Sequence, residues 1–229
     1  MKTVIIHGQS HKGSTYHIAN ILAEKIGYET KEYFLPRDFG ELCIGCKSCF
    51  FNGEETCPHY NNIKHIADAI DEADVVILAS PVYALNVTGA MKSLLDHFAY
   101  RFMVHRPQEC MFSKQGVCIS TAAGAGMGKT NKCMKDSLFY WGIPIVYKIG
   151  IGVAATSWDE VNSKKMAKID RATSSIAGMI TARAGRVRVG FKTKFIFGLM
   201  RMMNKNGWNP KDKEHWENMG WLGSKRPWN

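Results

Sequence analysis

Short apolar runs alternate with longer amphipathic segments over most of this chain, and this alternation constrains its fold more than any other feature. The first run, residues 3–6, is rich in β-branched residues, as a strand buried on both faces requires. Directly after it, Ile18, Ile21, Leu22 and Ile26 recur at helical spacing. Strands that alternate with helices form a parallel sheet covered by helices on both faces. The chain therefore belongs to the α/β class.

The same pattern continues along the chain. Further strands are predicted at residues 29–35, 74–79, 116–120 and 143–153, and further helices at 63–70, 88–100, 127–141 and 159–183. We therefore expect five parallel strands in one domain covering residues 1–183, followed by a C-terminal helical arm covering residues 184–229.

A loop of small and hydroxyl residues joins the first strand to the first helix. A helix N-terminus has unpaired N–H groups and a partial positive charge, so it binds anions. Ser10, Ser14 and Thr15 add hydroxyl groups, Lys12 adds a positive charge, and Ser14 or Thr15 is expected to be the N-cap. The loop has neither the Gly-Lys-Ser/Thr of a Walker loop nor three spaced glycines. It indicates a phosphate site or an ordinary capped turn.

Three loops of small or polar residues follow predicted strands, at residues 8–15, 80–86 and 121–126. In parallel sheets, ligands bind beyond the carboxyl ends of the strands, near the point where the strand order reverses. We therefore expect these three loops to meet at one ligand.

Four cysteines lie between the second strand and the next helix. Cys43, Cys46 and Cys49 are spaced as C-x-x-C-x-x-C, and Cys57 follows after seven residues. Three thiolates at this spacing can ligate three irons of a cubane cluster, with a fourth cysteine further on. A four-thiolate zinc site is an alternative, although zinc more often uses two separated C-x-x-C pairs.

Taken together, these motifs resemble a known family. Over about residues 1–155 the chain is similar to the flavodoxin-like NAD(P)H-dependent FMN reductases, and within them most similar to the iron–sulfur flavoproteins. The resemblance rests on the loop from Ser10 to Thr15, on Ser80-Pro81-Val82-Tyr83, on Met91-Lys92 and Asp96, and on the cysteine loop. Because some members of the wider family keep similar cysteines only as thiols, a [4Fe–4S] cluster, zinc and bare thiols all stay open.

The resemblance implies FMN as the cofactor. Its phosphate is expected at Ser10, Lys12, Gly13, Ser14 and Thr15. Its ring and ribityl chain are expected beside Pro81, Val82, Tyr83 and Asn86, and its pyrimidine edge beside Thr121, Ala122, Ala123, Gly124 and Gly126. The cysteine ligands of a cluster are expected to be Cys43, Cys46, Cys49 and Cys57.

The implied chemistry takes place on the flavin. N5 of FMN accepts a hydride from NAD(P)H, or electrons from a redox protein, and passes them to a small acceptor such as a quinone or flavin. No catalytic side chain is needed. The histidines, His97 and His105 among them, are expected to lack carboxylate partners. A non-enzymatic electron carrier is the alternative, but flavodoxins are typically acidic and this chain has a net charge of +10.

Composition bears on location and partners. The sequence has no apolar run long enough to span a membrane and begins directly with a strand, so we expect a cytoplasmic protein. Residues 183–229 hold 11 basic and 3 acidic residues, together with four of the six tryptophans. An amphipathic basic helix is predicted at residues 191–204. We expect this arm to join subunits of a homo-oligomer, ahead of binding to nucleic acid or a membrane surface.

Overall fold

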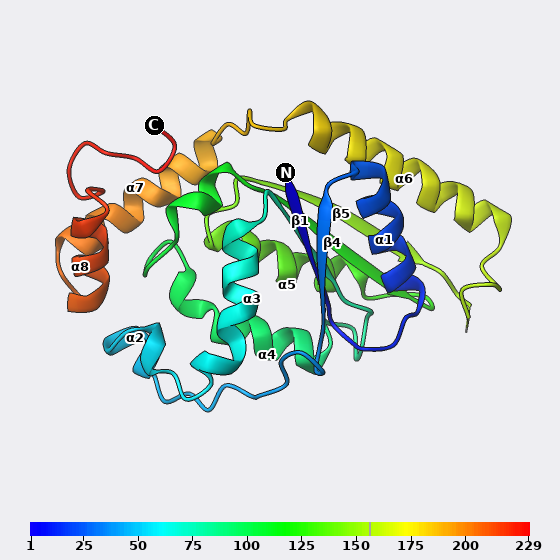
Figure 1. The fold of residues 1–229 in the computed structure, drawn as a ribbon, viewed down its shortest axis with the longest axis horizontal. Coiled ribbons are helices and arrows are strands. Elements are labelled where there is room, and N and C mark those ends of the chain that lie inside the picture. The colour runs from blue at the N-terminus through cyan, green and yellow to red at the C-terminus, as the bar shows by residue number, and fades with distance from the viewer. Residues whose placement is uncertain (156) are drawn as a thin grey trace.

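The computed structural model describes residues 1–155 and 157–229 and is built around a five-stranded parallel sheet of order β2-β1-β3-β4-β5 (Figure 1). The strands are β1 (Lys2–His7), β2 (Glu29–Phe34), β3 (Val75–Ala79), β4 (Gln115–Ala122) and β5 (Ile145–Gly152). The predicted sheet is therefore confirmed. One boundary was wrong, since Thr121 and Ala122 end β4 instead of starting the following loop. Both residues continue the ladder to β5, which keeps them in extended conformation.

Helices cover both faces of the sheet. The helices of the body are α1 (Ser14–Ile26), α2 (Ser48–Phe51), α3 (Tyr60–Glu72), α4 (Gly89–His97), α5 (Met127–Tyr140) and α6 (Ser163–Ala182), with short 3-10 turns η1 (Glu54–Thr56), η2 (Ala99–Arg101) and η3 (Glu109–Ser113). The side chains of Ile5 and Ile77 pack with α1 and α6 on one face. Those of Val4 and Val76 pack with α3, α4 and α5 on the other. Neighbouring strand residues thus point to opposite faces, both of them apolar, which is why the central strand β3 is a continuous apolar run.

The strand order places the reversal point beside β1. The chain passes from β1 outward to β2 and then returns across β1 to β3, so β1 lies between its two successors. The loops after β1 and β3 therefore flank the point where parallel sheets bind ligands.

The C-terminal arm folds onto the body of its own chain. Helices α7 (Phe191–Lys205) and α8 (Pro210–Asn218) lie at the opposite end of the molecule from α1 (Figure 1). Phe197, Trp216 and Trp221 are buried in a third apolar cluster together with Met103 and Phe112 of the body. The predicted helix at 191–204 is confirmed as α7, whereas α8 was not predicted. The division of the chain at residue 183 stays a prediction.

One face of α7 remains exposed. Phe191, Phe195 and Met202 are 83%, 60% and 58% exposed, among basic side chains of the same helix. Within the described residues, none of the helices combines the length and apolarity needed to cross a bilayer.

Candidate functional site

A cavity of about 290 Å³ opens at the carboxyl ends of β1, β3 and β4. The three loops that were expected to meet at one ligand all contribute to its wall. The lining residues are Gln9, His11, Gly13, Ser14, Thr15, Pro81, Val82, Tyr83, Thr121, Ala122, Ala123, Val153 and Ala155. The structure thus brings together nine of the residues named from the sequence for FMN.

The N-terminus of α1 at this cavity has no side-chain cap. We expected Ser14 or Thr15 to be the N-cap, but Gly13 holds that position in extended conformation, with φ at −90°. The Thr15 hydroxyl lies in the first helical turn and forms a hydrogen bond with the Thr121 hydroxyl instead. The first-turn N–H groups of α1 are therefore uncapped by side chains, which is the arrangement that an anion can complete.

The loops around the cavity are fixed by buried hydrogen bonds. The backbone N–H of Gly8 donates to the Ala79 carbonyl over 2.7 Å. The Thr88 hydroxyl donates to the Gly8 carbonyl over 2.5 Å, and the backbone N–H of Thr88 donates to the Ser80 hydroxyl over 3.1 Å. The first and second loops are thereby held together before any ligand binds.

Five of the residues named from the sequence lie outside the lining. The Ser10 hydroxyl donates to the Leu35 carbonyl over 3.4 Å, and the Lys12 ammonium lies 5.2 Å from the Tyr16 ring centroid. The Asn86 side chain accepts a hydrogen bond from the backbone N–H that follows it. The remaining two are Gly124 and Gly126. Roles for these five in binding FMN stay predictions.

Gly126 has a packing role that its neighbours make clear. It is the N-cap of α5 and has φ of +99°, a region that favours glycine. A Cβ atom at this position would lie 2.5 Å from Cγ1 of Val82, so this glycine lets the loop after β4 approach the loop after β3.

Four lining residues were not predicted from the sequence. Gln9 and His11 belong to the predicted loop between the first strand and the first helix, and their position in that loop is the signal that marks them. Val153 and Ala155 follow β5, whose carboxyl end lies on the same edge of the sheet. The Tyr83 hydroxyl donates to the Gln9 side-chain oxygen, which joins two of the loops across the cavity.

The four cysteines of residues 43–57 share a second, smaller cavity of about 60 Å³ with His59, Asp96 and His97. Burial, followed by the neighbouring thiols of Cys57, Cys43 and Cys46, raises the pKa of Cys49 to about 11. The four cysteines thus line one cavity, and all seven cysteines of the chain are free thiols. A metal centre here must stabilise thiolates strongly enough to overcome that raised pKa.

Helix α4 connects the two cavities. Thr88, its N-cap, is bonded to the loops of the first cavity, and His97, its last residue, lines the second. A helix of nine residues is about 13 Å long. The two cavities therefore lie at opposite ends of one short, rigid element.

The arm contacts the cysteine loop through a buried polar network. Arg106 donates to the backbone carbonyl of Cys49 and, over 3.3 Å, to that of Phe50. It also forms an ion pair of 2.5 Å with Asp212 of α8, whose side chain is fully buried. The amide of Asn209 donates to the Phe50 carbonyl over 3.1 Å. Asn209 and the Arg106–Asp212 ion pair thus anchor the cysteine loop to the C-terminal arm.

The expectation that the histidines lack carboxylate partners was wrong for two of them. His105 Nδ1 lies 2.7 Å from an oxygen of Asp212, and His7 Nε2 lies 2.6 Å from an oxygen of Glu32. The first pair joins residues 107 positions apart, which no local spacing could reveal.

Comparisons with known proteins agree with this architecture. Residues 1–156 match the family model described as NADPH-dependent FMN reductase. An iron–sulfur flavoprotein of Archaeoglobus fulgidus is 32% identical over 160 residues, which cover 67% of this chain and 67% of that protein. An NADPH azoreductase of a Bacillus species is 30% identical over 132 residues, which cover 57% of this chain and 64% of that protein.

The fold is also similar to that of solved structures. The NAD(P)H:quinone oxidoreductase of Methanothermobacter marburgensis superimposes with a TM-score of 0.59 at 16% identity, covering 77% of this chain and 98% of that one. The matched segments span about two thirds of the length of the two relatives above. The arm lies beyond the residues that the family model matches. The chain therefore belongs to the NADPH-dependent FMN reductase family of FMN-dependent oxidoreductases, as its motifs predicted.

Proposed function

We propose that this protein passes electrons from NAD(P)H or a redox protein, through FMN, to a small acceptor such as a quinone or flavin, with a [4Fe–4S] cluster in the cysteine loop. The observation that carries the flavin assignment is the uncapped N-terminus of α1 in the wall of the larger cavity. A phosphate monoester placed there gains hydrogen bonds and a favourable helix dipole together.

The residues around this cavity fit FMN. Ser14 and Thr15 offer first-turn N–H groups to the phosphate, and Tyr83, which is 53% exposed, offers an aromatic face at the rim. The small side chains of Ala122 and Ala123 let the backbone come close to a flat ring. When bound, FMN supplies hydride chemistry at N5. The protein then binds and orients the ring, and none of its own side chains is required as a nucleophile.

The cysteine loop fits an iron–sulfur cluster. Four cysteines line one small cavity, and Cys43, Cys46 and Cys49 have the ferredoxin-type spacing. The backbone between Cys43 and Cys49 has positive φ at Gly45, +67°, and at Lys47, +61°. A bound cluster supplies one-electron transfer, and α4 sets its separation from the flavin cavity. The name of the Archaeoglobus fulgidus relative supports this assignment.

We further propose that the exposed face of α7 joins subunits of a homo-oligomer in the cytoplasm. Its support is the row of exposed apolar side chains that includes Phe191, Phe195 and Met202. Nucleic acid and membrane surfaces are the less favoured partners, because the basic residues are interleaved with apolar ones instead of forming a continuous run.

The test is an anaerobic absorption spectrum with FMN, iron, sulfide and zinc contents, followed by steady-state NAD(P)H oxidation with a quinone. We expect one FMN and about four irons per chain, and continuous turnover. Cys46→Ala should lose iron and keep FMN, while Cys133→Ala, outside the loop, should keep both. FMN without iron leaves an FMN reductase with no cluster, and FMN without turnover indicates an electron carrier. No bound FMN after reconstitution refutes the whole proposal.

A further inference from the structure

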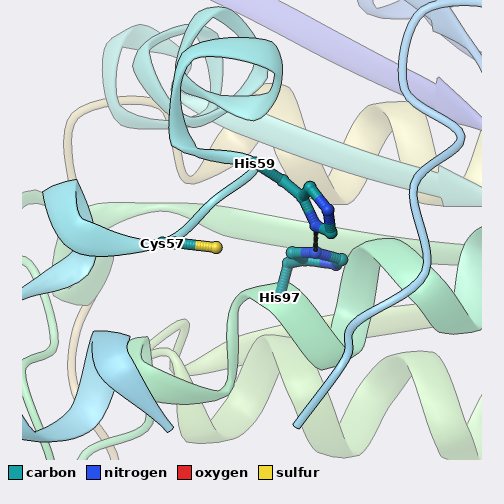
Figure 2. A group of neighbouring side chains, drawn as sticks. All are labelled: Cys57, His59 and His97. Atoms are coloured by element: carbon teal, nitrogen blue, oxygen red, sulfur yellow. Dashed lines mark hydrogen bonds between the residues drawn. The ribbon is translucent and has the colours of Figure 1, made fainter. Parts of the chain in front are cut away.

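Two histidines lie directly beside the last cysteine of the loop. Figure 2 shows the sulfur of Cys57 pointing toward the paired rings of His59 and His97. Cys57 follows η1, His59 immediately precedes α3, and His97 ends α4, so three separate elements converge here. One ligand atom of each residue lies within 4.8 Å of the other two. The three atoms are thus grouped tightly enough to surround one ion after a small adjustment.

The spacing suits a single transition metal better than separate irons of a cluster. With Zn–N at about 2.05 Å and Zn–S at about 2.3 Å, a tetrahedral zinc site holds its ligand atoms about 3.3–3.8 Å apart. His59 Nδ1 and His97 Nε2 are 2.9 Å apart, slightly less than this separation. Within the described part of the chain, this is the group of cysteine, histidine and acidic side chains compact enough for one ion.

The hydrogen bonds of His97 fix its ring in a ligating state. His97 Nδ1 lies 2.8 Å from the backbone carbonyl of Ser93, and a carbonyl oxygen can only accept a hydrogen bond. Nδ1 therefore carries the proton, and in the neutral ring Nε2 presents its lone pair toward His59. Metal-binding histidines typically donate their second N–H to a backbone carbonyl or carboxylate in this way, which fixes both tautomer and ring orientation.

We propose that Cys57, His59 and His97 form a binding site for one divalent transition metal, of which zinc is the expected ion. The site binds this ion when the cluster is absent. One sulfur and two nitrogen donors favour zinc, cobalt or nickel over magnesium or calcium. Binding displaces the Cys57 thiol proton to solvent and moves the proton of His59 from Nδ1 to Nε2, with no change of oxidation state. The nearby Asp96 carboxylate is paired with Lys92, so the fourth position is left open to water.

The two metal states exclude each other because both need Cys57. The loop therefore has one state with four cysteine ligands and one with a single cysteine and two histidines. The histidine site does not depend on the proposed cluster, so either proposal can be refuted while the other stands.

The test uses the FMN-loaded protein after anaerobic chelation, titrated with Co²⁺ as a coloured substitute for zinc. We expect one Co²⁺ per chain with a thiolate-to-metal absorption band, and displacement by Zn²⁺. His59→Ala and His97→Ala should each weaken Co²⁺ binding at least tenfold, and Cys57→Ala should abolish the thiolate band. The control His65→Ala, an exposed histidine of α3, should bind as the wild type does. FMN content verifies folding, and because His59 is only partly buried, His59→Ala is the milder variant if His97→Ala disrupts packing.

Reconstitution with iron and sulfide completes the test. We expect both histidine variants to rebuild the cluster to the wild-type iron content, while Cys57→Ala does not. Unchanged Co²⁺ affinity in both histidine variants overturns the proposal, as does loss of iron in them, which would make the imidazoles part of the cluster site. A wild-type protein that takes up no iron but binds Co²⁺ through the histidines refutes the cluster and leaves this site standing.

Discussion

Replacing Asp212 by alanine removes the carboxylate that joins the arm to the cysteine loop. This side chain is fully buried and pairs with Arg106, which is 4% exposed, and with His105. Without it, a buried guanidinium keeps the backbone carbonyls of the loop and the partly buried Glu54, at 3.3 Å, as its partners. Removing one member of a buried ion pair typically destabilises a protein by ~3–5 kcal/mol. That is a large part of the ~5–15 kcal/mol that stabilises a typical domain.

We therefore expect Asp212→Ala to lower the free energy of unfolding by ~3 kcal/mol or more, and to release iron from the proposed cluster faster than wild type. Urea unfolding followed by tryptophan fluorescence reports this directly, because Trp216 and Trp221 of the arm are fully buried. Loss of the arm alone should appear as an early separate transition with FMN still bound.

The matched control is Glu217→Ala, on the exposed side of the same helix. Its carboxylate lies 3.7 Å from the Lys213 ammonium, and such surface pairs contribute at most ~1 kcal/mol. If Asp212→Ala resembles this control in both unfolding free energy and iron release, Asp212 does not secure the cysteine loop.

Three further predictions concern other parts of the molecule. Gly126→Ala forces a Cβ atom to 2.5 Å from Val82 at a φ of +99°. It should lower stability by ~1–3 kcal/mol and weaken FMN binding in a fluorescence titration. Gly128→Ala, with open space around it, should do neither. Burial lowers the pKa of His7, against the opposing effect of Glu32, and burial also lowers the pKa of His215, both from 6.5. Below pH 6.5 the unfolded chain thus binds protons that the folded chain does not. The urea concentration at the unfolding midpoint should therefore be lower at about pH 5.5 than at about pH 7.5, and equal midpoints contradict this. Phe195→Asp on the exposed face of α7 should turn an oligomer into monomers in sedimentation, and an unchanged sedimentation coefficient excludes this face as the subunit contact.

The sheet and the larger cavity could be predicted because their signals are local. Continuous apolar runs such as residues 75–78 mark strands buried on both faces, and parallel strands bring their carboxyl ends to one edge. That geometry places Thr15 beside Thr121 although 106 residues separate them. The loops could therefore be assigned to one ligand before any contact was known.

Contacts of the arm could not be predicted in this way. Arg106 and Asp212 are also 106 residues apart, but no regular element relates them, and each looks like an ordinary surface charge in the sequence. The predicted N-cap of α1 was wrong for a related reason. Local preference favoured a hydroxyl residue, but Thr15 bonds to a distant strand and leaves the cap to Gly13.

The position of Asp212 near the C-terminus also sets an order of assembly. A chain made from its N-terminus has all five strands by residue 152, and with them most of the residues around the cavity at their carboxyl ends. The side chains that secure the cysteine loop, Asn209 and Asp212, are synthesised some sixty residues later. Domains fold as units during synthesis, so this cavity can form before the cysteine loop is held by α8. The residues of α8 thus determine when the cysteine loop becomes firmly held.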